Sequence, residues 1–359
     1  MIRPVLFVDL PGIIYAIDRR ARSRQREFAN FVCWLEPVED YLTPSPLLRN
    51  ILPLNPTSRT WMCEDHWRIL GFAQMRTRPS GTAWDMAYLA SIVQRNVPSS
   101  SEDEVLTALL EYTTEMAAMH GILRIFAKVE DEIPELGLFQ RSGFQRYARE
   151  LTYVYQPGGA SGPSEPPLPS LRRWNRHYAW GLHQLYRAVT PQRVQMAELL
   201  ESSEEYAKLH VGTQPLFSHR NENYVCDVGV RVGAWLRLCR GQGSTPNRLF
   251  LTVHPEHVDL AEPLLRFGVR QLQENDRRPI YCIVREYDSI VITALRTSGF
   301  EQTSTKDLLV RHMALLATRQ STSPLLEQRA VYGLKGLGTV NSRQKTLRLL
   351  ARSTDEDRT

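Results

Sequence analysis

The sequence predicts an α/β protein made of two tandem domains, each a central mixed sheet flanked by helices. Three observations favour this fold. A Gly/Pro-rich break lies near the middle of the chain, the same order of strand-like and helix-like segments is found on both sides of it, and a Ser-Gly-Phe tripeptide recurs at the same place in that order. The length of 359 residues also suits two domains of roughly 100–200 residues each.

The break is the segment QPGGASGPSEPPLP at residues 156–169. Gly and Pro at this density cannot continue a helix or a central strand, and small polar side chains add little to a core. We therefore predict domains at 1–157 and 169–318, a linker at 158–168, and a tail at 319–359.

Each half opens with a strand-like segment and a helix and continues with β-rich segments. The first half reads RPVLFVD, LPGIIYAIDRRA, RTWMCEDHWRILGFAQMRT and AWDMAYLASIV, with Asp9 and Pro11 at the expected start of the helix. The second half reads LRRWNRHYAW, GLHQLYRAV, QRVQMAELLE, NYVCDVGVRVGAWLRLCR and NRLFLTVHP. Alternating apolar residues in the later segments indicate antiparallel strands.

The period then changes to that of an amphipathic helix in EVLTALLEYTTEMAAMHG and in AEPLLRFGVRQLQEND. Both helices lead to an apolar strand, a short helix, the Ser-Gly-Phe tripeptide and a last strand. Leu109 and Leu264 lie 155 residues apart, and Gly143 and Gly299 lie 156 apart. This near-constant offset indicates a duplicated domain, and the two glycines are expected to end the short helices in the left-handed conformation.

Composition narrows the class of protein. A content of 42% hydrophobic and 23% charged residues is typical of a folded soluble protein. We see no apolar run of about 20 residues and no signal-peptide pattern, so we predict no membrane association and a cytoplasmic location. Five cysteines without a CxxC pair argue against a disulfide framework and a zinc ribbon.

The formal charge of +5 is concentrated in the tail, which has eight Lys/Arg against four Asp/Glu and so carries +4. A basic tail can attract nucleic acid or an acidic partner. A solvated extension is the simpler interpretation.

The repeat resembles the GNAT superfamily of N-acetyltransferases. The resemblance covers nearly all of 1–157 and 168–318 and rests on LFQRSGF at 138–144, LTVHP at 251–255, AEPLL at 261–265 and ALRTSGF at 294–300. It implies transfer of an acyl group from acetyl-CoA or another acyl-CoA to an amine of a small molecule or peptide. In this family the cofactor lies in a V between the fourth and fifth strands, and the fourth strands here are YLASIV and LFLTVHP.

The resemblance also implies a diphosphate loop of the form Q/R-x-x-G-x-G/A, from which this chain departs. In the first half the motif positions fall on Ser101, Glu104 and Leu106, among acids that repel phosphates. In the second half they fall on Glu256, Asp259 and Ala261, of which only the alanine fits. The cofactor-binding residues carried over to the second half are Leu251, Thr252, Val253, His257, Val258, Asp259, Leu260 and Ala261.

His254 and His257 have a metal-like H-x-x-H spacing, but the sequence offers no obvious third ligand. We predict no metal. A turn with two surface imidazoles explains the pattern.

Amine acylation needs a base and often an acid. Many family members place a Tyr four residues before the glycine as the acid, where this chain has Phe139 and Leu295. Acidic side chains that follow the fifth strands are candidate bases: Glu130, Asp131, Glu132, Glu286 and Asp288, with Tyr287 between the last two. We select Glu286 and Asp288, although Asp288 and Glu132 are also placed to cap a helix.

The primary hypothesis is therefore an N-acyltransferase whose second half binds the thioester. The alternative is an inactive tandem GNAT-like binding or scaffold protein that uses its basic tail. A third hypothesis is a transferase that takes its acyl group from a charged tRNA. The acceptor and the oligomeric state stay open.

Overall fold

The computed structural model describes residues 1–9, 11–13, 30–34, 58–66, 68–92, 102–131, 136–157, 171–200, 202–207, 221–229, 231–241, 246–274 and 277–313. Contacts place all of the described residues in one compact unit, Met1–Leu315. This unit contains the first predicted domain, 1–157, and residues 169–315 of the second. The predicted linker 158–168, the tail 319–359 and Glu132 lie outside the described residues.

The described residues of the first half form seven strands and three helical segments. They are β1 (Ile2–Pro4), η1 (Phe7–Asp9), β2 (Asn30–Trp34), β3 (Ser58–Asp65), β4 (Arg68–Thr77), β5 (Ala83–Ser91), α3 (Glu102–Met119), β6 (Arg124–Glu130), α4 (Leu136–Arg141) and β7 (Gln145–Tyr155). One strand, β2, lies off the main strand order of the sheet.

The second half repeats the series with extra helices after its first strand. Its elements are β8 (Leu171–Arg173), η3 (Arg176–Tyr178), α5 (Ala179–Val189), α6 (Gln192–Glu198), α7 (Ser203–Tyr206), β9 (Asn221–Val228), β10 (Arg231–Cys239), β11 (Asn247–Val253), η5 (Pro255–Leu260), α8 (Ala261–Gln273), β12 (Ile280–Arg285), α9 (Ser289–Thr297) and β13 (Glu301–His312). None of the helices in the described part of the chain is long and apolar enough to cross a membrane.

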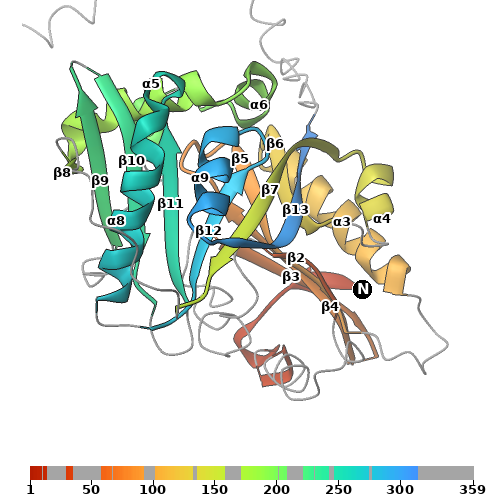
Figure 1. Cartoon of the computed structure of the whole chain (residues 1–359). Helices are drawn as coiled ribbons and strands as arrows, with labels where there is room; N and C mark the ends of the chain where they lie inside the picture. Colours follow the sequence, from red (N-terminus) through yellow and green to blue (C-terminus); the bar gives the residue numbers. More distant parts are fainter. Residues whose placement is uncertain are drawn as a thin grey trace, which may run out of the picture. The chain divides into compact units, whose positions relative to one another are not determined.

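The strands form one 13-stranded sheet in the order β1-β3-β4-β5-β6-β13-β7-β12-β11-β10-β9-β8, with β2 paired to β5 off this path (Figure 1). The strand order is symmetric about its centre, between β13 and β7. Read from either end, each strand of one half is matched by its counterpart in the other half. This arrangement is what a duplicated unit related by a local two-fold axis produces.

The centre of the strand order shows an exchange of last strands. The first half's β7 pairs with β12 of the second half, whereas the second half's β13 pairs with β6 of the first. The two exchanged strands also pair with each other along most of their length. Each half is thus completed by a strand of the other, which explains why both lie in one compact unit.

Alternation along the strands separates two faces of the sheet, because successive side chains point to opposite sides. On β10, Ala234, Leu236 and Leu238 join the core beneath α8 and α9, whereas Trp235 joins the core beneath α5 and α7. Val232 also joins the latter core, because the register of β10 shifts between Val232 and Ala234. In the first half the main core lies beneath α3 and α4. Helices therefore cover both faces of the second half.

The repeated Ser-Gly-Phe tripeptide ends α4 and α9 as predicted. Gly143 has φ +81° and Gly299 has φ +80°. The N–H of Phe144 donates to the carbonyl of Phe139, and the N–H of Phe300 donates to that of Leu295, each at 3.0 Å. This six-to-one bond is the helix-ending pattern that requires a left-handed residue.

We expect Gly299→Ala to lower the free energy of unfolding by about 1–2 kcal/mol, because a Cβ strains a residue at positive φ. Space is not limiting, since the nearest atom to that Cβ would be Cε2 of Tyr155 at 3.9 Å. Urea denaturation measures the change.

Two control variants separate strain from side-chain size. Gly299→Asn should recover part of the loss, since Asn tolerates this conformation. Gly137→Ala, within α4 and without a positive φ, should not destabilise. An equal loss in all three variants would contradict the assignment.

Candidate functional site

Each half contains one pair of parallel neighbours that begins together and then separates. The strands β5 and β6 pair only through Ala83–Asp85, although β5 continues to Ser91. Likewise β11 and β12 pair only through Asn247–Leu249, although β11 continues to Val253. Beyond these three pairs the described strands form a wedge in each half.

The two wedges differ. In the first half, β2 pairs antiparallel with β5, from Asn30 opposite Ser91 to Trp34 opposite Tyr88. Since β4 already holds the other edge of β5 there, β2 must occupy the wedge edge, and it contacts β6 as well. A segment of the chain itself therefore pairs with the edge that faces the first wedge.

The second wedge leaves the edge of β11 without a paired strand among the described residues. The N–H of His254 donates to Gly233 on β10 at 2.8 Å, whereas the N–H of Asn247 donates to Pro279 on the β12 side at 3.2 Å. Backbone groups alternate along a strand. Leu251 and Val253, which share the parity of Asn247, therefore direct their backbone groups into the wedge.

A short 3-10 turn replaces the expected diphosphate loop after β11. His254 precedes η5, and its Nδ1 accepts the N–H of Glu256 at 3.2 Å. The N–H of His257 donates to the carbonyl of His254 at 2.9 Å. The helix α8 starts directly after this turn, so these two amides are already bonded within it.

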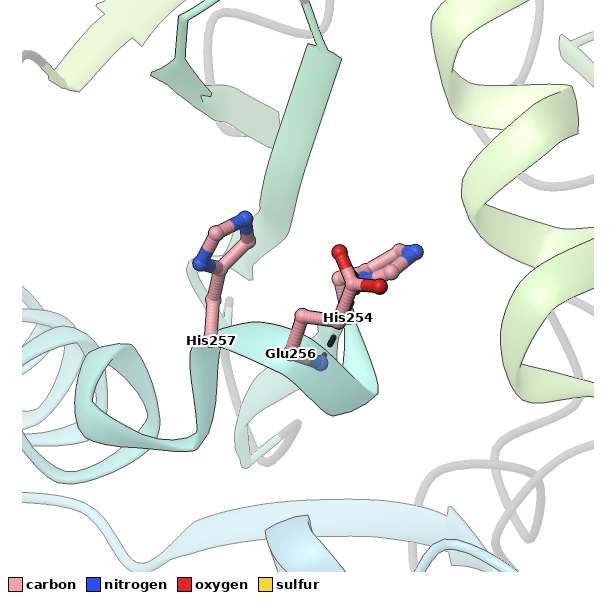
Figure 2. Close-up of side chains that lie close together, drawn as sticks. All are labelled: His254, Glu256 and His257. Atoms are coloured by element: carbon pink, nitrogen blue, oxygen red, sulfur yellow. Dashed lines mark hydrogen bonds and ion pairs between the residues drawn. The ribbon is translucent and has the colours of Figure 1, made fainter.

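His254, Glu256 and His257 form the metal-like cluster of the described residues, with one ligand atom from each within 4.8 Å of the others (Figure 2). The glutamate supplies the third group that the sequence did not suggest. However, the Nδ1 lone pair of His254 already accepts the Glu256 amide. The local geometry is that of a capped turn, and the absence of a metal stays a prediction.

A groove of about 320 Å³ lies between α8 and α9 on one face of the sheet. Val258 and Ala261, two of the predicted cofactor-binding residues, line it. The rest of its lining is Glu262, Ser289, Ile290, Thr293, Ala294 and Thr297. By contrast, the side chain of Leu260 is buried in the core, and Asp259 is exposed beside the groove.

A second cavity, of about 490 Å³, lies on the opposite face and is lined from both halves. On β11 and β12 the core side chains include Leu249 and Cys282, whereas the residues of alternate parity, such as Phe250, Thr252 and Arg285, line the cavity. We call it the inter-half cavity. The open wedge of the second half separates it from the groove.

Ion pairs from the first half form one wall of the inter-half cavity. Arg78 bonds Asp85 through Nε at 2.8 Å and stacks over the ring of Phe126 at 3.5 Å. Lys128 bonds both carboxylate oxygens of Glu150, at 3.0 and 3.1 Å. Burial would raise the pKa of Glu150, but Lys128 and then Arg285 outweigh it and hold the pKa below its usual value.

The second half adds Arg285 and a buried carboxylate from α6. Glu198 is 8% exposed and accepts the hydroxyl of Tyr186 at 2.8 Å and Nη2 of Arg285 at 3.3 Å. Strand register places Arg285 directly opposite Glu150, and their ion pair measures 3.9 Å. Burial, followed by the charge of Glu198, raises the pKa of Tyr186, which keeps this hydroxyl protonated.

The two predicted catalytic acids lie in different settings. Asp288 is 7% exposed, lines the inter-half cavity and caps α9 by accepting the N–H of Val291 at 3.2 Å. Burial raises its pKa to about 6, although the hydrogen bond from Val291 opposes the shift. Glu286 is exposed, lies 4.0 Å from Arg193 and is not part of the cavity wall.

The positions of the missing family tyrosine are core positions. Phe139 and Leu295 are fully buried beneath the helices. Tyr287 instead lines the inter-half cavity, and burial raises its pKa, so it stays protonated at neutral pH. Of the first-half candidates, Asp131 pairs with Arg149 at 3.2 Å.

Sequence reasoning missed most of the charged cavity wall. Asp85 and Lys128 each follow apolar residues within a strand, which is a signal because a charge on a buried face needs a partner. Glu150 gives no such signal, since it follows Arg149 in a mixed segment. The convergence of all three with Glu198 and Arg285 depends on the strand exchange, which no local pattern announces.

Comparison with solved structures identifies the fold. A tandem GNAT protein from the clavulanic acid biosynthesis pathway matches with a TM-score of 0.55 at 15% identity, over 87% of this chain and 98% of that protein. The chain has the tandem GNAT acetyltransferase fold. A GCN5-related N-acetyltransferase from Sphaerobacter thermophilus matches with a TM-score of 0.52 at 12% identity, over 87% and 95% of the two chains. No protein-family model matches the sequence, and no curated protein does.

The raised pKa of Asp288 allows a test of its burial through the pH dependence of stability. The pKa of Asp288 is 3.8 in the unfolded chain and about 6 in the folded protein. The folded state therefore binds more protons between these values, and the wild type loses stability as the pH rises from about 4 to about 6. We expect Asp288→Asn to keep the helix cap and to be more stable above pH 6 by on the order of 2–3 kcal/mol.

Urea denaturation at pH 4, 5 and 7.5 checks this expectation, with the exposed neighbour variant Glu286→Gln as the control. The gain from Asp288→Asn should be present at pH 7.5 and small at pH 4. A gain that does not depend on pH would show that the carboxyl is not desolvated.

Proposed function

We propose that this protein is an N-acyltransferase that works with its second half, taking an acyl group from an acyl-CoA and passing it to an amine in the inter-half cavity. The observation that carries the proposal is the open edge of β11 at Leu251 and Val253, with a groove on one face and a polar cavity on the other. A donor and an acceptor approaching from opposite faces would meet in the wedge.

The pantetheine arm of an acyl-CoA suits the second wedge. Its amides need backbone partners in an extended geometry, and Leu251 and Val253 present them, with Thr252 between them on the cavity side. Val258 and Ala261 begin the groove that would take the remainder of the cofactor, and Ser289, Thr293 and Thr297 add hydroxyl groups there. The thioester supplies the activated acyl group.

The diphosphate part has a weaker match. The turn lacks the glycines of the family loop, and Glu256 and Asp259 are exposed near it. Glu262 is compensated by an ion pair with Arg266 one turn further along α8. We therefore place the main affinity in the pantetheine arm, with the imidazole of His257 in the turn available as a hydrogen-bonding group.

The first half is proposed to be structural. The first turn of α3 carries Glu102, Asp103 and Glu104, which favour the helix dipole and oppose phosphate. Its wedge edge is paired with β2. Its contribution to the site is the cavity wall that carries Lys128 and Glu150.

Asp288 is our proposed general base. It faces the cavity, and a pKa of about 6 leaves it ionised at neutral pH and able to accept a proton from the attacking amine. Tyr287, protonated and in the same cavity wall, is proposed to return a proton to the leaving thiolate. We do not assign Glu286 a role in this step, because it lies outside the cavity wall.

Isothermal titration of the full chain with acetyl-CoA and longer acyl-CoA thioesters tests the proposal, which expects one site per chain. No heat from any thioester, with folded protein, would reject it. That result would favour the alternative of a GNAT-like binding protein that uses the tail 319–359.

We expect Thr293→Trp to weaken acyl-CoA binding at least 10-fold, because the indole would fill the groove between α8 and α9. The matched control is Gly137→Trp at the equivalent place in α4, 156 residues earlier in the chain. It should leave affinity unchanged. Equal losses in both variants would contradict binding in the second half.

We expect Asp288→Asn to lower kcat by about 10²–10³-fold, since a positioned base contributes that order of acceleration. In the wild type, kcat/KM should fall below pH 6 as the carboxyl is protonated. In the variant this limb should vanish, which a pH profile of thiol release measures. A retained limb near pH 6 would assign the base elsewhere.

A further inference from the structure

We propose that the acceptor is an amine that also bears a carboxylate, and that Arg285 in the inter-half cavity binds this carboxylate. The inference rests on the proposed function and specifies its acceptor. It follows from how the charges of the cavity are matched and from the position of one guanidinium.

The acids that line the cavity leave little room for a polycation. Asp85 is paired with Arg78, Glu150 with Lys128, and Glu198 with Arg285. Asp288 lines the wall, but its Oδ1 accepts the N–H of Val291 at the start of α9. A polyamine or a multiply charged amino sugar would have to break one of these pairs to find a counter-charge.

Among the described residues of the lining, the cations outnumber the acids by one. These residues include five cationic side chains, Arg78, Lys128, Arg237, Arg248 and Arg285, and four acidic ones, Asp85, Glu150, Glu198 and Asp288. The difference is five minus four, or +1. This surplus favours a ligand that carries an anionic group, and a carboxylate fits the planar fork of a guanidinium.

The guanidinium of Arg285 has N–H donors that no described residue accepts. A guanidinium has five N–H donors, and among the described residues Arg285 makes one hydrogen bond, from Nη2 to Glu198. Nη1 is buried without a hydrogen-bond partner among the described residues, and its nearest acid, Glu150, is 3.9 Å away. The side chain is 24% exposed and lines the inter-half cavity.

The position of Arg285 suits this role. It ends β12 on the cavity face, beside the open wedge, and Tyr287 and Asp288 follow it within three residues and line the same cavity. A small molecule anchored by its carboxylate at Arg285 can present its amine to Asp288. Both charges of an amino acid then find a partner, and the amine, after losing its proton, attacks the thioester carbon as the thiolate leaves.

The test compares amines that differ in one group, using acetyl-CoA-dependent thiol release by the full chain. The pairs are lysine against 1,5-diaminopentane, phenylalanine against phenethylamine, and β-alanine against 2-aminoethylphosphonate. We expect kcat/KM to be at least 10-fold higher for the carboxylate member of each pair. Preference for a decarboxylated amine or for the phosphonate would overturn the inference.

Variants locate the preference at Arg285. Arg285→Lys keeps the charge but loses the fork geometry, so KM for the carboxylate member should rise about 10-fold while kcat stays within a few-fold. Where that variant does not fold, the doubly neutral variant Arg285→Gln with Glu198→Gln removes a matched pair and should abolish the preference. Arg172→Gln, on an exposed arginine of β8, is the control and should change neither value.

The two proposals fail in different ways. No heat from any acyl thioester would reject the acyltransferase function itself. Heat from acetyl-CoA together with equal use of both members of each pair would leave that function standing and reject Arg285 as the carboxylate site.

Discussion

The antiparallel pairing of β7 with β13 at the centre of the sheet is the constraint on which the rest of the structure depends. It places each half's last strand beside the other half's β6 or β12. The register of β7 then sets Glu150 between Arg285 and Lys306. Because those neighbours come from distant parts of the chain, the charged cavity wall exists only when both halves are folded together.

The same pairing carries a second ionic cluster on its other surface. Asp307 is 1% exposed and accepts Nε of Arg149 at 2.9 Å, with Arg146 at 3.4 Å. Arg149 also reaches Asp131 at 3.2 Å. A buried carboxylate without such partners would be strongly destabilising. The exchange therefore favours one register of β13 against β7, in addition to the apolar contacts of the two cores.

Much of the architecture follows from local pattern. The apolar periods locate α3 and α8, and the tripeptide at Gly143 and Gly299 marks helix ends that the structure confirms with positive φ and a six-to-one bond. These features depend on a few neighbouring residues, so a sequence can predict them. The duplicated order of elements extends the prediction to the GNAT fold, which the solved relatives bear out.

The exchange of β7 and β13 was beyond such reasoning. Each exchanged strand pairs with a neighbour from the other half, so the pairing depends on long-range register that no local pattern encodes. The cavity was hidden for the same reason. Glu198 reads as an ordinary helical acid, and its partners Tyr186 and Arg285 lie 12 and 87 residues away in the chain. Asp288, which lines the cavity, could be selected as a candidate because capping and a position after a strand are local signals.

The N-terminus of a helix can be stabilised by a carboxylate of the chain or can bind a phosphate, and the two compete for the same position. At a helix N-terminus a carboxylate stabilises the helix, and a phosphate would use the same dipole. In α3 the first turn holds three carboxylates, so the helix is stabilised at the expense of any phosphate. In α8 the single first-turn acid, Glu262, is paired with Arg266. The asymmetry in charge and the asymmetry of the wedges therefore favour the same half.

Under the proposed function, this division gives the first half a role even though the edge that faces its wedge is paired with β2. The first half supplies β6 and β7, and these strands carry Lys128 and Glu150 to the inter-half cavity. Without them Arg285 would face only Glu198, and one wall of the cavity would be missing. In the proposed reaction the acceptor would bind in this cavity, where charges interact more strongly than at an open surface, and recognition of its charged groups would therefore be more selective.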